Sequence, residues 1–195
     1  MNIDLNKLNK YVDEYIELKT LYQRNNFCQP DFKKYFNQCY TIRSKSDKWY
    51  TTFYNIFVRC KNYKLSFKEV LTKLYEETHE IHASFCSKMI ALVYDDKPIW
   101  DQYVFDWLGF RIKKMPKDPY KRIDYCSKIY DEIEQEYKKH MEDDNVINAL
   151  KQFDFINPFG IYLPKIKKLD FILRSIESDR TSSIFEYEDL SELMK

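Results

Sequence analysis

The chain has 195 residues, of which 44% are hydrophobic, 32% are charged and 17% are aromatic, and its formal net charge is +1. This balance predicts a single globular domain over residues 1–195 and excludes a disordered chain. Only Gly109 and Gly160 are glycines, which excludes glycine-rich phosphate loops and a β-rich fold with many tight hairpins.

Apolar residues recur at helical spacing along most of the chain, which predicts an all-α fold, a compact bundle of about eight to ten helices. The expected helices cover residues 4–24, 48–61, 66–80, 83–94, 102–108, 119–140, 144–153, 165–178 and 185–194. Ser66 and Glu69 have capping-box spacing, and Asp118-Pro119 is typical of a helix start. Residues 83–94 are apolar nearly all round, which indicates a central, buried helix.

Two stretches between these helices have no helix assigned to them. Residues 32–40 are expected to form a short aromatic segment after a break at Pro30. Residues 157–164 carry Asn-Pro and Gly signals and are expected to form a loop. No internal repeat or long linker divides the chain.

The five cysteines, at positions 28, 39, 60, 86 and 126, are odd in number and none has C-x-x-C spacing. They are expected to be reduced and mostly buried, which favours a cytoplasmic location. The first residues show no apolar signal region. No apolar run approaches the ~20 residues of a membrane helix, so no membrane association is expected.

Charge is unevenly distributed along the chain. Residues 111–122 contain six basic residues and one acidic residue, whereas residues 177–192 contain six acidic residues and one Arg. The basic stretch is expected either to contact the phosphates of DNA or to be an ordinary solvated surface. The acidic stretch is expected to lie on a C-terminal helix that offers a surface to a protein partner.

Residues 82–109, HASFCSKMIALVYDDKPIWDQYVFDWLG, form an apolar helix, a turn, a short apolar step, an Asp and an amphipathic helix. This order resembles the core of the helix-hairpin-helix DNA glycosylase superfamily, which includes 8-oxoguanine DNA glycosylase. The residues that carry the resemblance are Ala83, Cys86, Ile90, Ala91, Pro98, Ile99, Trp100, Asp101, Val104 and Leu108.

The resemblance implies removal of a modified or damaged base from DNA by hydrolysis of its N-glycosidic bond. Asp101 would be the catalytic carboxylate that activates water or stabilises positive charge on the sugar. His82, Lys88, Trp100 and Trp107 would bind the substrate, with the aromatic rings stacking on a base. The expected contacts to the DNA backbone are Arg111, Lys113, Lys114, Lys117, Lys121 and Arg122, with Lys165 to Lys168 as further candidates.

Three departures from the family pattern refine this expectation. The position of the lyase nucleophile holds His82 instead of Lys, so the activity is expected to be monofunctional, leaving an abasic site. The four-Cys cluster pattern is absent, and no cofactor is expected. The hairpin glycines are missing from residues 76–84, which favours the alternative of a non-catalytic helical protein-interaction module.

Each candidate also has a structural interpretation. Asp101 is placed to cap the helix 102–108, and Trp100 and Trp107 have the character of core residues. His79 and His82 are spaced to share a metal on one helix face, but no second ligand cluster accompanies them, and no metal is expected. Lys88 lies within an apolar helix and needs to reach solvent or find a partner, for which Asp101 and Asp106 are the candidates.

Overall fold

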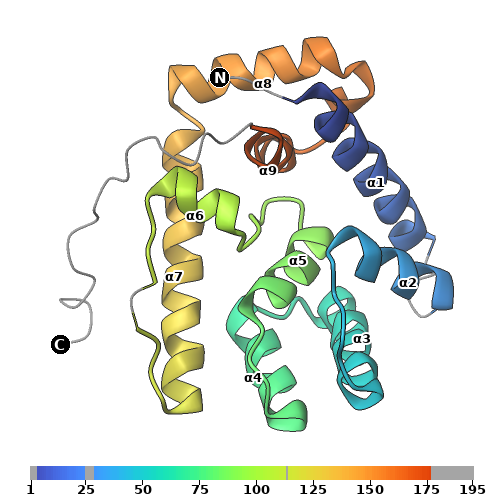
Figure 1. Ribbon diagram of the computed structural model, residues 1–195, viewed down its shortest axis with the longest axis vertical. Helices are drawn as coiled ribbons and strands as arrows, with labels where there is room; N and C mark the ends of the chain where they lie inside the picture. Colours follow the sequence, from blue (N-terminus) through green and yellow to red (C-terminus); the bar gives the residue numbers. More distant parts are fainter. Residues whose placement is uncertain (1–3, 25–28, 113, 177–195) are drawn as a thin grey trace.

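The computed structural model describes residues 4–24, 29–112 and 114–176. Within them the chain forms nine α-helices and one 3-10 helix, with no β-strand (Figure 1). In chain order these are α1 (Leu5–Gln23), α2 (Pro30–Cys39), α3 (Asp47–Tyr63), α4 (Phe67–Thr78), α5 (Ala83–Val93), α6 (Gln102–Leu108), α7 (Pro119–His140), α8 (Asp144–Ile156), η2 (Pro158–Tyr162) and α9 (Lys165–Ser175). The prediction of an all-α chain is confirmed.

Two of the predicted helix starts, those of α7 and α4, have side-chain caps. The Asp118 carboxylate accepts a hydrogen bond from the backbone N–H of Lys121 at 2.9 Å, and Pro119 is the first residue of α7. The Ser66 hydroxyl accepts from the N–H of Glu69 at 3.3 Å, and the Glu69 carboxylate accepts from the N–H of Ser66 at 2.7 Å. These bonds pair backbone donors that a helix start otherwise leaves open.

The aromatic segment predicted at residues 32–40 has no helix assigned to it from the sequence, but the structure places residues 32–39 in α2, with Tyr40 as its C-cap. Phe32 and Phe36 are one turn apart and both face the Phe57 ring of α3, with centroids 5.5 and 5.4 Å away. This aromatic packing stabilises a short helix whose intrinsic propensity is modest, because most helical stability in proteins comes from tertiary contacts.

The C-terminal third differs in smaller ways. The predicted loop at 157–164 contains the 3-10 helix η2, and α8 extends three residues past its expected end, to Ile156. The helix expected at 165–178 ends at Ser175. The predicted acidic helix at 185–194 lies outside the described residues.

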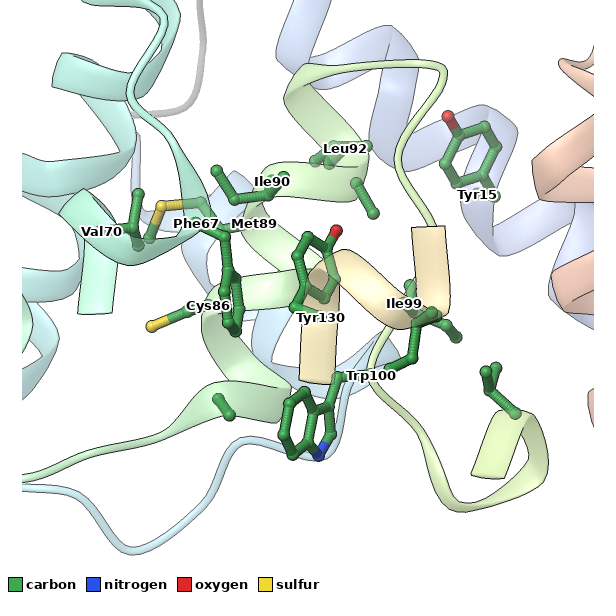
Figure 2. Packing of buried hydrophobic residues seen from close by; sticks show 14 of the residues in the cluster. Tyr15, Phe67, Val70, Cys86, Met89, Ile90, Leu92, Ile99, Trp100 and Tyr130 are labelled. Carbon is green, nitrogen blue, oxygen red and sulfur yellow. The ribbon is translucent and has the colours of Figure 1, made fainter. Parts of the chain in front are cut away.

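Helix α5 runs through the middle of the molecule, and eight of its eleven residues are buried (Figure 1). Beside it, Phe67 of α4 stacks on Tyr130 of α7 with ring centroids 4.1 Å apart, and Trp100 lies next to Phe67 (Figure 2). The predicted central position of residues 83–94 is confirmed. Cys86 and Cys126 are also buried, as expected.

A polar cluster is enclosed between α7 and α9. The Tyr137 hydroxyl donates to Asp170 Oδ1 at 2.6 Å, and Lys167 Nζ lies 3.5 Å from Asp170 Oδ2 and also donates to the carbonyl of Lys97. Lys167 and Lys168 are only 2% and 5% exposed. The expectation that these two lysines contact phosphates is therefore wrong, because their ammonium groups face protein acceptors.

The two ends of the described chain meet. Helices α1 and α9 pack together, and the N–H of Asp4 donates to the carbonyl of Ser175 at 2.8 Å. The Tyr15 ring of α1 lies edge-on to Phe171 of α9, with centroids 5.5 Å apart. Among residues 4–24, 29–112 and 114–176, no helix has the length and apolar character needed to cross a bilayer.

Candidate functional site

A hollow of about 250 Å³ lies at the N-terminal end of α5. We call it the α5 hollow; it is lined by Ile81, His82, Ala83, Ser84, Phe85, Trp100, Met115, Arg122 and Cys126. These residues come from the start of α5, from Trp100 just before α6, and from the basic stretch 111–122 and the first turns of α7. We call residues 111–122 the basic loop. The fold thus brings three predicted site residues, His82, Trp100 and Arg122, to one hollow.

His82 is a polar group of the α5 hollow and is held by two neighbours. Its Nε2 lies 2.7 Å from Lys45 Nζ and 2.7 Å from Glu80 Oε2, and these two groups are themselves 2.6 Å apart. The imidazole stacks on Phe85 and meets the edge of Trp49, at centroid distances of 5.3 and 5.6 Å. Its orientation is therefore fixed both by hydrogen bonds and by ring packing.

The Glu80 carboxylate is the acidic member of this cluster. Hydrogen bonds from His82 and Lys45 lower the pKa of Glu80 below its ordinary value, so it remains an acceptor at neutral pH. Sequence reasoning missed both partners of His82. Glu80 was visible two residues away, whereas Lys45 is 37 residues distant in the chain and no local pattern identifies it.

Asp101 is the N-cap of α6, and its carboxylate accepts from the N–H of Tyr103 at 3.2 Å. The same carboxylate lies 3.7 Å from Lys88 Nζ, and the Asp101 side chain is 13% exposed. The predicted capping role is thereby confirmed, and Asp101 is the partner that the sequence required for Lys88. Asp106 instead accepts a hydrogen bond from Gln102 at 2.7 Å.

Lys88 is buried in α5 and connects Asp101 to the α5 hollow. Its Nζ donates to Ser84 Oγ at 3.0 Å, and Ser84 lines the hollow. Burial lowers the pKa of Lys88, while the nearby Asp101 carboxylate acts in the opposite direction. The buried ammonium group is thus compensated by one carboxylate and one hydroxyl, and Lys88 itself does not line the hollow.

The two predicted tryptophans have different positions. Trp100 lines the α5 hollow, and its backbone N–H donates to the buried Ser87 hydroxyl at 2.8 Å. Its ring is largely covered by Phe67 and Phe105. Trp107 packs against Tyr137 and His140 on α7 and does not line the hollow.

The basic loop borders the α5 hollow on one side. Arg122 is half-buried on its wall, where its Nε donates to the carbonyl of Pro116 at 2.9 Å. The other described cations expected to contact DNA are exposed: Arg111, Lys114, Lys117 and Lys121. Lys113 lies outside the described residues. The exposed cations and the hollow therefore occur on neighbouring parts of the molecule.

The spacing of His79 and His82 does not produce a metal site in the described structure. His79 is exposed and ends α4 in the left-handed conformation, with φ 57°. Among the described residues, no group of three or more His, Cys, Asp or Glu side chains is arranged to hold a metal ion.

No family model, curated protein or solved structure matches this chain. The function is therefore inferred from the α5 hollow, from Asp101 and from the resemblance carried by residues 82–109.

Proposed function

We propose that this protein binds DNA and removes a modified or damaged base by hydrolysing its N-glycosidic bond. The α5 hollow carries this proposal. It combines apolar and aromatic walls, an oriented imidazole and the cationic Arg122. Asp101, the carboxylate that the family resemblance selects, does not line the hollow and is connected to it through Lys88 and Ser84.

The size of the α5 hollow suits a small planar ligand. Pockets for drug-sized molecules span roughly 300–1,000 Å³, and this hollow measures about 250 Å³. A base that leaves the DNA stack is usually held between aromatic or apolar side chains. Phe85 and Trp100 supply apolar contact area, and His82 supplies a polar group for the edge of the base.

Asp101 supplies the charge that the reaction requires. Cleavage of the bond between C1′ and the base nitrogen builds positive charge on the sugar, which a carboxylate stabilises. The base departs with the bonding electron pair, water adds its oxygen to C1′ and gives a proton to the Asp101 carboxylate, and that proton then passes to the departed base. The partial exposure of Asp101 permits access of water to this carboxylate.

The same arrangement supports a reaction that leaves an abasic site without cutting the strand. A lyase activity needs a free amine that attacks C1′. Position 82 holds His, and Lys88 is buried and engaged with Asp101 and Ser84. Neither group supplies a free amine in the α5 hollow.

The decisive experiment measures abasic sites on a panel of genomic DNAs, unmodified and naturally base-modified, treated with wild type and with Asp101→Asn. Asn caps helices about as well as Asp, so this substitution retains the cap of α6. It also removes the carboxylate that pairs with buried Lys88, so the variant must show the helical circular dichroism and thermal midpoint of the wild type. Positioned carboxylates contribute roughly 10²–10⁴-fold to such reactions. We expect wild type to form abasic sites and Asp101→Asn to form at least ~100-fold fewer.

Asp106→Asn is the matched control, because Asp106 is also a carboxylate on this segment but bonds only to Gln102. It should retain wild-type activity. Equal activity of Asp101→Asn and wild type would remove Asp101 from the reaction. No abasic sites on any DNA, with a normally folded wild type, would leave the non-catalytic interaction module as the better account.

A further inference from the structure

The turn between α8 and α9 exposes large apolar side chains. Phe155, Phe159 and Tyr162 are 88%, 83% and 92% exposed, and Ile156 and Ile161 are 37% and 54% exposed. We call these five residues the aromatic turn. Single exposed apolar residues are ordinary, but five within eight positions of the chain are an unusual concentration, and exposed apolar area of this kind favours an interaction site.

The aromatic turn has a defined conformation set by buried polar groups beneath it. The Asn157 side chain, which is 7% exposed, accepts from the N–H of Gly160 at 2.9 Å and donates to Asn9 of α1 at 3.2 Å. Gly160 is buried against the Phe153 ring, where an added Cβ would lie 2.5 Å from Phe153 Cε1. These contacts hold the backbone of η2 against the fold.

A buried lysine fastens the other end of the same turn. Lys168 Nζ donates to the carbonyl of Ile161 at 3.1 Å and pairs with the Asp154 carboxylate on α8. The fold therefore uses a buried cation and a buried amide to fix a turn whose aromatic side chains point away from the core. Because the turn is ordered in advance, binding through it loses little conformational entropy.

The area of the aromatic turn matches what a dimer interface needs. An aromatic side chain offers roughly 150–250 Å², so the three aromatic residues expose on the order of 500 Å². A standard interface covers about 800 Å² on each partner, and in homodimers about 65% of it is apolar. The aromatic turn alone supplies an apolar core of that size.

We propose that the aromatic turn is the interface through which two copies of this chain form a two-fold dimer. No charged residue occurs from position 155 to 164, so the surface has no charge that would repel its own copy or select an oppositely charged partner. In a two-fold interface the same patch faces itself, and stacked or edge-to-face pairs of Phe and Tyr rings satisfy this condition. This inference goes beyond the proposed function and is independent of it.

The test is sedimentation velocity of the full chain from low micromolar concentration upward. Wild type should shift with concentration from 24.0 kDa to twice that mass. The variant Phe155→Ser/Phe159→Ser/Tyr162→Ser should remain a monomer at every concentration. These side chains make little contact with the core, so the variant should keep the helical circular dichroism and thermal midpoint of the wild type.

A control with the same number of exposed aromatic residues removed elsewhere is Tyr63→Ser/Tyr103→Ser/Tyr120→Ser, at positions that are 73%, 41% and 55% exposed. It should dimerise as wild type does. A wild type that stays monomeric throughout would overturn the proposal and assign the aromatic turn to a different occupant. A dimer that persists in the first triple variant would also overturn it, because the contact would then lie on another surface.

Discussion

Asp170 shows how a single buried carboxylate is accommodated. It is 2% exposed and receives hydrogen bonds from Tyr137 and Lys167. Burial is the largest influence and raises the pKa of Asp170 from 3.8 to about 6, although Lys167, Tyr137 and Arg174 act to lower it. Burial likewise lowers the pKa of Lys167. Desolvation thus prevails over pairing for both members of this cluster.

The raised pKa of Asp170 predicts a pH-dependent stability difference. Between 3.8 and about 6, the folded chain holds a proton on Asp170 that the unfolded chain has lost. Because the folded state binds more protons, the contribution of Asp170 to the free energy of unfolding falls as pH rises through this window and is level above it. Asp170→Asn cannot titrate. The stability of wild type minus that of Asp170→Asn should therefore decrease from about pH 4 to about pH 6.

Urea denaturation at a series of pH values measures this difference. The carboxylates of Asp4, Glu69 and Glu80 have lowered pKa values and give slopes of opposite sign, but they are common to both proteins and cancel in the subtraction. A difference that is flat or rises for Asp170→Asn would contradict the assignment.

The partner of a charged residue could be predicted where the sequence placed that residue in an apolar helix. Lys88 lies in an apolar helix, so its need for a partner could be inferred, and Asp101 was one of two candidates. Lys167 and Lys168 belong to a run of charged residues, a pattern that is typical of a solvent-exposed surface. Their burial depends on α7, α8 and the Lys97 carbonyl, none of which a local pattern around α9 contains.

At the scale of elements, the sequence predicts a helix best where neighbouring residues supply its N-terminal cap. Asp118-Pro119 placed the start of α7, and its predicted end at residue 140 also agrees with the structure. Residues 32–40 carry no side-chain cap. Pro30 is the first residue of their helix, a position that Pro favours, but it was interpreted as a break. The packing of Phe32 and Phe36 on Phe57 of α3 then stabilises the helix.

Gly160 in η2 is packed so closely that a substitution there should lower the free energy of unfolding. A Cβ at this position would lie 2.5 Å from Phe153 Cε1 and 3.3 Å from Asn157 Oδ1. Phe153 is buried and cannot easily move aside. Overpacking of this kind typically destabilises by about 1–3 kcal/mol, and we expect Gly160→Ala to lower the free energy of unfolding by this amount in urea denaturation.

The matched variant is Phe153→Leu/Gly160→Ala. The smaller Leu removes the atoms that the new methyl group would meet, so the effect of Gly160→Ala should be smaller in the Phe153→Leu background than in wild type. Equal effects in both backgrounds would show that the contact with Phe153 is not the cause.

At the scale of the whole molecule, the α5 hollow depends on residues far apart in the sequence. Residues near positions 45, 82, 100 and 122 converge on it. The sequence identified His82, Trp100 and Arg122 for separate reasons, through a family resemblance and a charge run. Their convergence required the packing of α4 against both α5 and α7, which brings the basic loop to the start of α5. Trp107 was grouped with them by proximity in sequence, but its helix turns it toward α7.

The charge distribution of the whole molecule supports a final prediction about DNA binding. Net charge is only +1, so affinity should come from the local cations of the basic loop and not from the overall field. Each phosphate contact contributes about 0.9 to the slope of log affinity against log salt. Lys114→Ala/Lys117→Ala/Lys121→Ala should therefore reduce the magnitude of the slope by about 2–3, as measured by fluorescence anisotropy on duplex DNA.

The control variant Lys10→Ala/Lys34→Ala/Lys138→Ala removes the same charge from exposed sites on α1, α2 and α7 and should leave the slope close to that of wild type. Equal reductions in both triple variants would mean that DNA responds to net charge alone, and the basic loop would then have no specific role beside the α5 hollow.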